Sequence, residues 1–161
     1  WRRNNLMQKS LPHKQLLTLR LEVNSAATVS VGKTPEGQRK IAPISGGAFN
    51  GDRLNGTVEP GGADWVRLRP DGTLMIDVRL TLRTDDGAMI YLTYQGRFVD
   101  AAGVMTQLAE GRTLAPESYS LVTTAKFECG DERYAWLNDV IAVGIGEQEG
   151  FNPTYTIFEI G

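Results

Sequence analysis

The feature that most constrains this chain is a long alternation of apolar and polar residues near its middle. Apolar side chains occupy every second position over residues 74–83, and the alternation resumes over residues 89–99 after the turn-forming segment 84–87. Successive side chains of a β-strand point to opposite faces, whereas a helix repeats every 3.6 residues. Gly87 can adopt the positive φ that tight turns require. The two segments therefore predict one long β-hairpin.

Shorter segments with the same period extend along the rest of the chain. Further strands are expected at residues 17–23, 39–44, 49–58, 65–69, 119–128, 140–145 and 154–160. Turn-type residues separate them, including the segment 69–73 and the glycine pairs Gly46-Gly47 and Gly61-Gly62, which we interpret as breaks between strands. About nine or ten short strands with frequent turns are typical of a β-sandwich or a closed β-barrel.

Glycines inside the expected strands favour the barrel. Gly51, Gly56, Gly96 and Gly144 lie where glycine weakens a strand and marks a bend, a bulge or a close approach of two backbones. A closed barrel needs more such corners than a sandwich does. We therefore predict an all-β fold, with a single antiparallel β-barrel over residues 16–161 and little helix. The long connection at 100–116 is expected to hold a short helix or to act as a lid over the barrel mouth.

Size and charge exclude several classes of protein. The chain has 161 residues and a formal net charge of −2, which suits one domain without the clustered positive charge of a nucleic-acid binder. No apolar segment approaches the roughly 20 residues that span a bilayer, so we expect no membrane association. The absence of a targeting signal favours a cytoplasmic location. Residues 1–15, which begin with Trp1, are expected to form a flexible N-terminal arm or a cloning remnant.

The chain contains one cysteine, Cys129, and one histidine, His13. An intramolecular disulfide, a cysteine-rich zinc site and a centre with several histidines are therefore impossible within one chain. Motifs for nucleotide phosphates, zinc proteases and calcium loops are absent as well. We expect no metal and no cofactor, so acid–base chemistry would have to use mostly Asp, Glu, Tyr, Lys and Arg.

One candidate catalytic residue follows the second glycine pair. Asp64 lies next to Trp65, and a carboxyl group that is desolvated by an aromatic ring has a raised pKa, which suits a general acid or base. The alternative interpretation is a hairpin loop with a capping aspartate and a core tryptophan.

Two further candidates share one face of the strand at 74–83. If Asp77 and Arg79 point into the barrel, they form a buried pair in which Arg79 stabilises an oxyanion and Asp77 orients it or transfers a proton. If they point outward, they are part of a charged exterior. Alternation alone favours the solvent face.

Aromatic and amide side chains supply the remaining candidates. Tyr91 is a possible hydrogen-bond donor to a carbonyl oxygen, and the alternative is a surface aromatic residue. Tyr94 belongs to the opposite, apolar face of the same strand and is a candidate ligand-binding residue together with Trp65. Trp136 and Asn138 offer a second aromatic ring and an amide, although a core anchor and a turn asparagine would have the same pattern.

A series of separated motifs resembles the family called domain of unknown function 3237. They are, in chain order, VGKTPEGQR at 31–39, GGAFNG at 46–51, GGADW at 61–65, DVR at 77–79, TDDGA at 84–88, YQG at 94–96 and WLN at 136–138. The resemblance covers roughly residues 12–160. It implies a single-domain barrel of calycin-like or allene-oxide-cyclase-like shape, found in bacteria and fungi.

The resemblance also bears on the site. It implies that Asp64, Trp65, Asp77 and Arg79 belong to the typical pattern of the family, which favours the barrel interior for the polar face of the hairpin. Some fungal members occur among enzymes of natural-product assembly, which implies a cofactor-independent lyase, isomerase or cyclase. This implication rests on analogy, because one barrel can serve many functions.

Three functions remain open. In an enzyme acting on a small aromatic or carbonyl-bearing molecule, Asp64 or Asp77 would transfer a proton, Arg79 and Tyr91 would stabilise an oxyanion, and the two candidate tryptophans would stack on the ligand. The alternatives are a ligand-carrying barrel without catalysis and an interaction module with a filled core. A polar interior would leave the leucine face of the hairpin outside, so we expect a homo-oligomer, a dimer, that covers it.

Overall fold

The long hairpin pairs its two strands along almost their whole length. In the computed structural model, which describes residues 10–161, it consists of β6 (Leu74–Thr84) and β7 (Met89–Val99). The two strands pair without a register shift from Leu74 opposite Phe98 to Arg83 opposite Met89. Gly87 closes the turn with a φ of +91°. The predicted hairpin is therefore confirmed.

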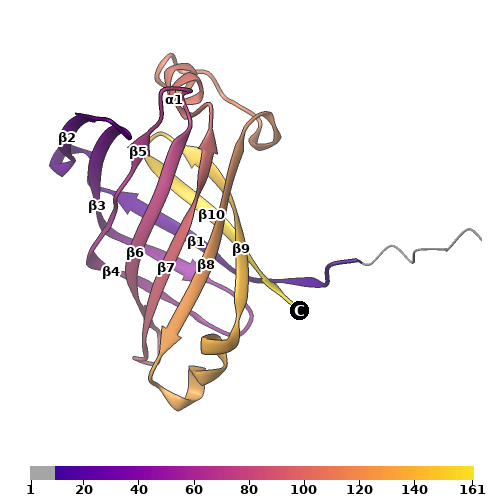
Figure 1. The fold of residues 1–161 in the computed structure, drawn as a ribbon. Helices are drawn as coiled ribbons and strands as arrows, with labels where there is room; N and C mark the ends of the chain where they lie inside the picture. Colours follow the sequence, from indigo (N-terminus) through magenta and orange to yellow (C-terminus); the bar gives the residue numbers. More distant parts are fainter. Residues whose placement is uncertain (1–9) are drawn as a thin grey trace, which may run out of the picture.

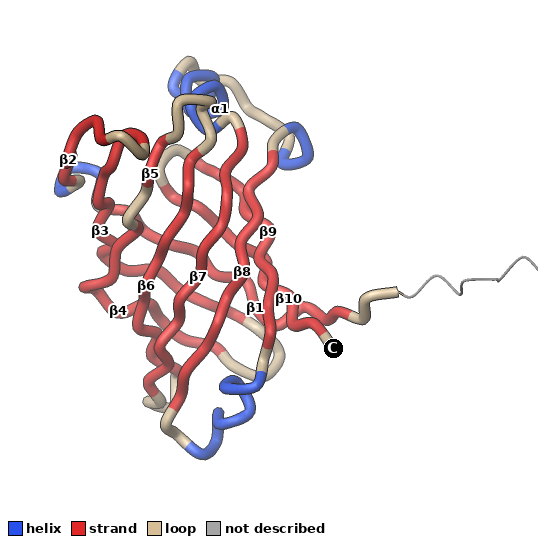
Figure 2. The backbone as a smooth tube through the Cα atoms, in the orientation of Figure 1, coloured by secondary structure: helices blue, strands red, loops and turns tan. Residues whose placement is uncertain are grey.

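The hairpin is part of a closed antiparallel β-barrel (Figures 1 and 2). The other strands of the ring are β1 (His13–Val23), β3 (Gly37–Asn50), β4 (Asn55–Asp64), β8 (Ser120–Cys129), β9 (Ile141–Glu149) and β10 (Asn152–Ile160). They follow the order β1-β10-β9-β8-β7-β6-β4-β3, and β1 pairs with β3 to close the ring. Two short strands lie off the ring: β2 (Val29–Thr34) pairs with β3, and β5 (Arg67–Leu68) bridges β3 and β6.

Short helices lie at both ends of the barrel. The helix expected within residues 100–116 is α1 (Ala101–Ala109), which lies with η2 (Pro116–Ser118) at one end, while η3 (Glu132–Asp139) lies at the other (Figure 2). A further turn of helix, η1 (Ser25–Ala27), connects β1 to β2. None of the helices in residues 10–161 is long and apolar enough to cross a membrane. The predicted arm falls largely on residues 1–9, outside the described residues, and β1 already begins at His13.

The apolar face of β6 points into the barrel, so the interior location of the polar face that the resemblance favoured is wrong. Four apolar side chains of β6 are between 0 and 6% exposed, namely Ile76, Val78, Leu80 and Leu82. The side chains of Asp77 and Arg79 lie on the outer surface, 32% and 45% exposed. Burying each leucine-sized side chain stabilises the fold by about 1.5–3 kcal/mol, which the polar face cannot match.

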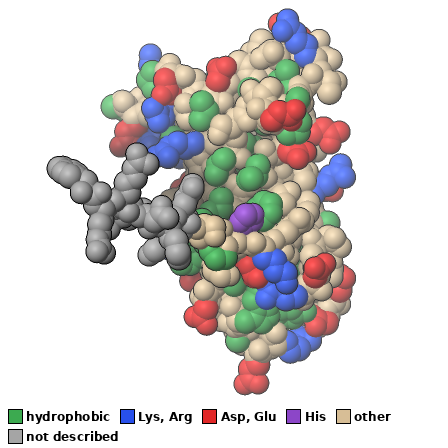
Figure 3. All heavy atoms as spheres, turned by 90° about the vertical axis from the view of Figure 1, so that its right-hand side faces the viewer, with side chains coloured by type: hydrophobic (Ala, Val, Ile, Leu, Met, Phe, Trp, Pro, Cys, Tyr) green, Lys and Arg blue, Asp and Glu red, His purple; other side chains and the backbone are tan. Residues whose placement is uncertain are grey.

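This orientation removes the reason for expecting a dimer. The leucine face that a second copy was expected to cover is already covered by the other strands of the barrel. On one outer face of the barrel, acidic and basic side chains are interspersed with hydrophobic ones (Figure 3). A homo-oligomer therefore stays a prediction without this support.

The sequence predicted that the two glycine pairs separate strands. In the structure both pairs lie inside strands instead, the first in β3 and the second in β4. The pairing of β3 with β4 shifts its register between Ile44 and Ala48, and that of β4 with β6 shifts between Glu59 and Ala63. Gly47 has a φ of +140°, and a Cβ atom there would lie 2.1 Å from the carbonyl oxygen of Arg20. Such bulges bend a strand sharply, so the pairs are corners of the barrel. The actual turn lies at residues 51–54, within the strand expected at 49–58.

One half of the barrel is filled by its own side chains. This half adjoins the end of the barrel that carries η3 and the turns connecting β3 to β4 and β6 to β7. Its fully buried residues include Leu17, Phe49, Leu54, Leu82, Ile90, Phe127 and Leu137. Leu137 belongs to η3 and is 0% exposed, so this helix seals its end of the barrel. A cavity lies toward the opposite end, which carries α1.

The close backbone approach at Gly56 gives a test of the barrel packing. A Cβ atom at Gly56 would lie 2.0 Å from the carbonyl oxygen of Arg83 and 2.8 Å from Cζ of Phe49. We therefore expect Gly56→Ala to lower the free energy of unfolding by about 1–3 kcal/mol or more, as overpacking does. Gly130→Ala is the matched control, because a Cβ atom there meets nothing within 4 Å. Urea denaturation measures both, and equal stabilities would contradict the packing.

Candidate functional site

An apolar cavity of about 510 Å³ occupies the hollow half of the barrel, next to α1. Its walls come from the ends of the strands nearest that helix, and Met105 of α1 also lines it. The apolar lining includes Leu21, Ile44, Val78, Phe98 and Leu121. The volume lies within the range of roughly 300–1,000 Å³ that small-molecule sites occupy. The cavity is therefore large enough for a compact organic ligand.

Asp64 is the one acidic residue among those that line this cavity. Asp64 is the last residue of β4 and pairs with Val78 of β6. Because paired residues of an antiparallel sheet share a face, the side chain of Asp64 points inward, as that of Val78 does. Its Oδ1 accepts a hydrogen bond of 3.0 Å from the backbone N–H of Asp77, which holds the carboxyl group in place.

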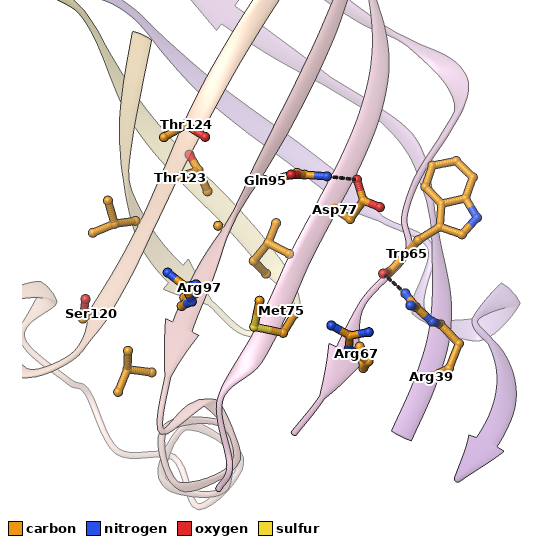
Figure 4. A pocket seen from close by; sticks show the side chains of 14 residues that line it. Arg39, Trp65, Arg67, Met75, Asp77, Gln95, Arg97, Ser120, Thr123 and Thr124 are labelled. Carbon is orange, nitrogen blue, oxygen red and sulfur yellow. Dashed lines mark hydrogen bonds between the residues drawn. The ribbon is translucent and has the colours of Figure 1, made fainter. Parts of the chain in front are cut away.

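The environment of Asp64 favours its neutral form. Burial raises the pKa of its carboxyl to about 7, and the negative charge of Asp77 acts in the same direction. The hydrogen bond from the backbone of Asp77 and the charge of Arg39 lower the pKa by less. Trp65 is not the cause, because its ring lines a separate groove outside the barrel (Figure 4). At neutral pH the carboxyl of Asp64 is present in both protonation states.

Two tyrosines lie in the same cavity. Tyr94 of β7 and Tyr155 of β10 are each 2% exposed, and their ring centroids lie 5.1 Å apart. Burial raises the pKa of both phenols, and the charge of Asp64 adds to the shift of each. Both therefore stay protonated at neutral pH and can donate hydrogen bonds. Sequence reasoning missed Tyr155, although it alternates with Ile157 in the strand expected at 154–160.

The other residues predicted on the hairpin lie outside the barrel. Asp77 and Arg79 form an ion pair of 3.5 Å on the outer surface, and the guanidinium of Arg79 lies 4.9 Å from the ring centroid of Trp65. Tyr91 also faces outward and is 40% exposed. The cavity lining therefore includes none of four predicted residues: Trp65, which precedes the hairpin, and Asp77, Arg79 and Tyr91 on it. Their proposed roles stay predictions.

Trp136 and Asn138 belong to η3, at the sealed end of the barrel. The guanidinium of Arg53 lies 3.9 Å from the ring centroid of Trp136. Asn138 accepts a hydrogen bond from the backbone N–H of Cys129 and donates one to its carbonyl, both of 2.9 Å. These contacts attach η3 to the barrel, and neither residue lines the cavity. Of the eight predicted residues, Asp64 and Tyr94 are the two that line the cavity.

The mouth of the cavity is more polar than its interior. Exposed or half-buried side chains there include Ser25, Thr28, Ser30, Lys40 and Gln148. Within the described part of the chain, no group of three or more His, Cys, Asp or Glu side chains is placed to hold a metal ion. The chemistry available inside the mouth is therefore that of one carboxyl group with a pKa near neutrality and two phenol donors, with the ammonium group of Lys40 at the rim. A carboxyl of this kind serves equally as a general acid or a general base.

Known proteins share both the sequence pattern and the fold. A family model described as "Protein of unknown function (DUF3237)" matches residues 13–160, which confirms the resemblance noted from the motifs. A UPF0311 protein from Rhodopseudomonas palustris is 30% identical over 138 residues, covering 86% of this chain and 89% of that protein.

Solved structures match almost the whole chain. The crystal structure of a beta-barrel like protein from Acinetobacter baumannii has a TM-score of 0.82 and 34% identity, covering 95% of this chain and 98% of that one. An enzyme from Penicillium herquei has a TM-score of 0.70 and 21% identity, covering 95% of this chain and 96% of its own. The second likeness shows the fold alone.

The raised pKa of Asp64 predicts how stability depends on pH. Because the pKa is about 7 in the folded protein against an ordinary aspartate value of 3.8, folding favours the protonated carboxyl. Its stabilising contribution is complete below pH 4 and is lost as the pH rises through about 7, by roughly 2–4 kcal/mol.

We expect Asp64→Asn to remove this decline between pH 4 and pH 7, because the amide does not titrate and its oxygen can still accept the hydrogen bond from Asp77. Urea denaturation across the pH range measures the slope, and ¹³C NMR titration of the carboxyl measures the pKa directly. A carboxyl that titrates near pH 4 would contradict the site geometry.

Proposed function

The chain belongs to the family of proteins of unknown function DUF3237, and we propose that its barrel cavity is the active site of a cofactor-independent enzyme of lyase, isomerase or cyclase type. The observation that carries the proposal is the carboxyl of Asp64, which has a pKa of about 7 and lines an apolar cavity beside two buried phenols. Catalytic acids and bases commonly have pKa values shifted toward the working pH.

The lining of the cavity indicates the class of substrate. Its walls are mostly aliphatic and aromatic, which favours a ligand with a large apolar part. A carboxylate at Asp64 repels an anionic group, so we infer a neutral molecule. Two phenol donors suit a carbonyl or hydroxyl oxygen on that molecule. A small aromatic or carbonyl-bearing compound meets these conditions.

The proposed reaction is the transfer of a proton. Ionised Asp64 would remove a proton from a carbon or a hydroxyl group next to the bound carbonyl. Tyr94 and Tyr155 would donate hydrogen bonds to the oxygen as negative charge develops on it. Protonated Asp64 would then return the proton to another atom of the same molecule, so that no external oxidant or reductant is needed. The apolar walls would exclude water that competes for the proton.

A ligand carrier is the second candidate, because the same apolar cavity would also hold a molecule without changing it. The interaction module with a filled core is less well supported, since it requires a barrel without a cavity of this size. A barrel of the same fold occurs in an enzyme from Penicillium herquei, so this fold is compatible with catalysis.

The proposal predicts different outcomes for two aspartate variants. Against a panel of neutral aromatic ketones, we expect Asp64→Asn to lower turnover by about 10²–10⁴-fold, the usual contribution of a general acid or base, while the ligand still binds. Asp52→Asn is the matched control, because this exposed aspartate lies in the turn between β3 and β4, outside the cavity lining, and the change should leave turnover unaltered. Mass spectrometry of the products measures turnover, and calorimetry measures binding.

Two results would contradict the proposal. If the unaltered protein binds members of the panel but returns every one unchanged, the carrier is the better account. If Asp64→Asn retains full turnover, Asp64 does not transfer the proton.

A further inference from the structure

A second hollow, of about 700 Å³, lies on the outer surface of the barrel (Figure 4). It extends over β3, β5, β6, β7 and β8, on the opposite side of the sheet from the cavity. Three arginines line it, namely Arg39, Arg67 and Arg97, and we call it the arginine groove. The proposed reaction uses none of them.

Strand register places the three arginines in one row. Arg39 of β3 pairs with Arg67 of β5, Arg67 pairs with Met75 of β6, and Met75 pairs with Arg97 of β7. Neighbouring strands lie about 4.8 Å apart, so the backbones of Arg67 and Arg97 are about 10 Å apart, and a ligand between their long side chains would lie over Met75. Figure 4 shows Arg39 and Arg67 side by side, with Arg97 beyond Met75. Like charges directly opposite each other destabilise a sheet, and here the pair is Arg39 and Arg67.

The positive charge of the groove is poorly matched by its own carboxylates. Arg67 forms an ion pair with Glu36, but its Nε is buried and has no hydrogen-bond partner among the described residues. Arg39 donates to the carbonyl oxygen of Trp65. Asp77, the one acidic residue lining the groove, is paired with Arg79.

Arg97 is the least engaged of the three arginines. Its backbone is paired in the sheet, but among residues 10–161 its guanidinium makes no hydrogen bond or ion pair, and the side chain is exposed. A concentration of guanidinium groups on a chain whose formal net charge is −2 is a local feature rather than a consequence of composition.

From this row we propose that the arginine groove is a second binding site, which takes a compact small-molecule anion bearing carboxylate or phosphate groups. Guanidinium groups bind both groups with paired, charge-assisted hydrogen bonds. Such a ligand reduces the repulsion between Arg39 and Arg67 and provides acceptors for the guanidinium of Arg97. The site is separate from the cavity, where the carboxyl of Asp64 disfavours anions.

Binding of pyrophosphate and of citrate to the whole protein tests this site. Both are too polar and too highly charged for the apolar cavity, so binding reports on the outer surface. We expect each to raise the melting temperature in a saturable way, beyond sodium chloride at matched ionic strength. Arg97→Gln, a change at an exposed side chain, should weaken the affinity measured by calorimetry at least tenfold.

Arg20→Gln is the matched control, since it removes one positive charge from an exposed position of β1 outside the groove. It should leave the affinity within about twofold. Binding of pyrophosphate alone assigns the site to phosphates, and binding of citrate alone assigns it to carboxylates; both support the proposal. It is overturned if neither anion stabilises the protein more than sodium chloride does, or if Arg97→Gln and Arg20→Gln bind equally well.

Discussion

The inward burial of every second side chain of β6 and β7 is the constraint on which the rest of the structure depends. It places Val78 and Tyr94 opposite each other inside the barrel and Asp77 and Gln95 opposite each other outside it. Each strand therefore presents one chemistry to the cavity and another to the outer surface. The two hollows described above lie on the two sides of this same pair of strands.

The position of Asp64 depends on the corner at the second glycine pair. Two extra residues enter β4 there, because Glu59 pairs with Thr81 whereas Ala63 pairs with Arg79. Because the number of extra residues is even, the alternation of inward and outward side chains is preserved, and Asp64 shares the inner face with Val78. A polar group thus reaches the apolar cavity at the end of a strand, where a single backbone N–H holds it. The shifted pKa of Asp64 follows from that placement rather than from its neighbour in the sequence.

Periodicity predicted the hairpin and the all-β class, because these depend on local alternation. The glycines inside strands favoured the barrel, and the long connection after β7 predicted a short helix or a lid. Periodicity did not locate the corners, since a glycine pair has the same sequence whether it ends a strand or bends one. It also placed the candidate hydrogen-bond donor at Tyr91, on the polar face, although the cavity belongs to the face of Tyr94. Trp136 attaches a helix at the sealed end, and this depends on contacts between distant segments that alternation does not report.

The central claim is that the carboxyl of Asp64 meets the reacting part of a neutral ligand inside the barrel. A crystal structure of the protein soaked with 1-tetralone, a neutral aromatic ketone, tests it most directly. The account predicts the ring among the aliphatic walls of the cavity, with the carbonyl oxygen within about 3 Å of a phenol oxygen and the adjacent carbon facing Asp64. A ketone bound on the outer surface, with the cavity filled by rearranged side chains, would contradict it.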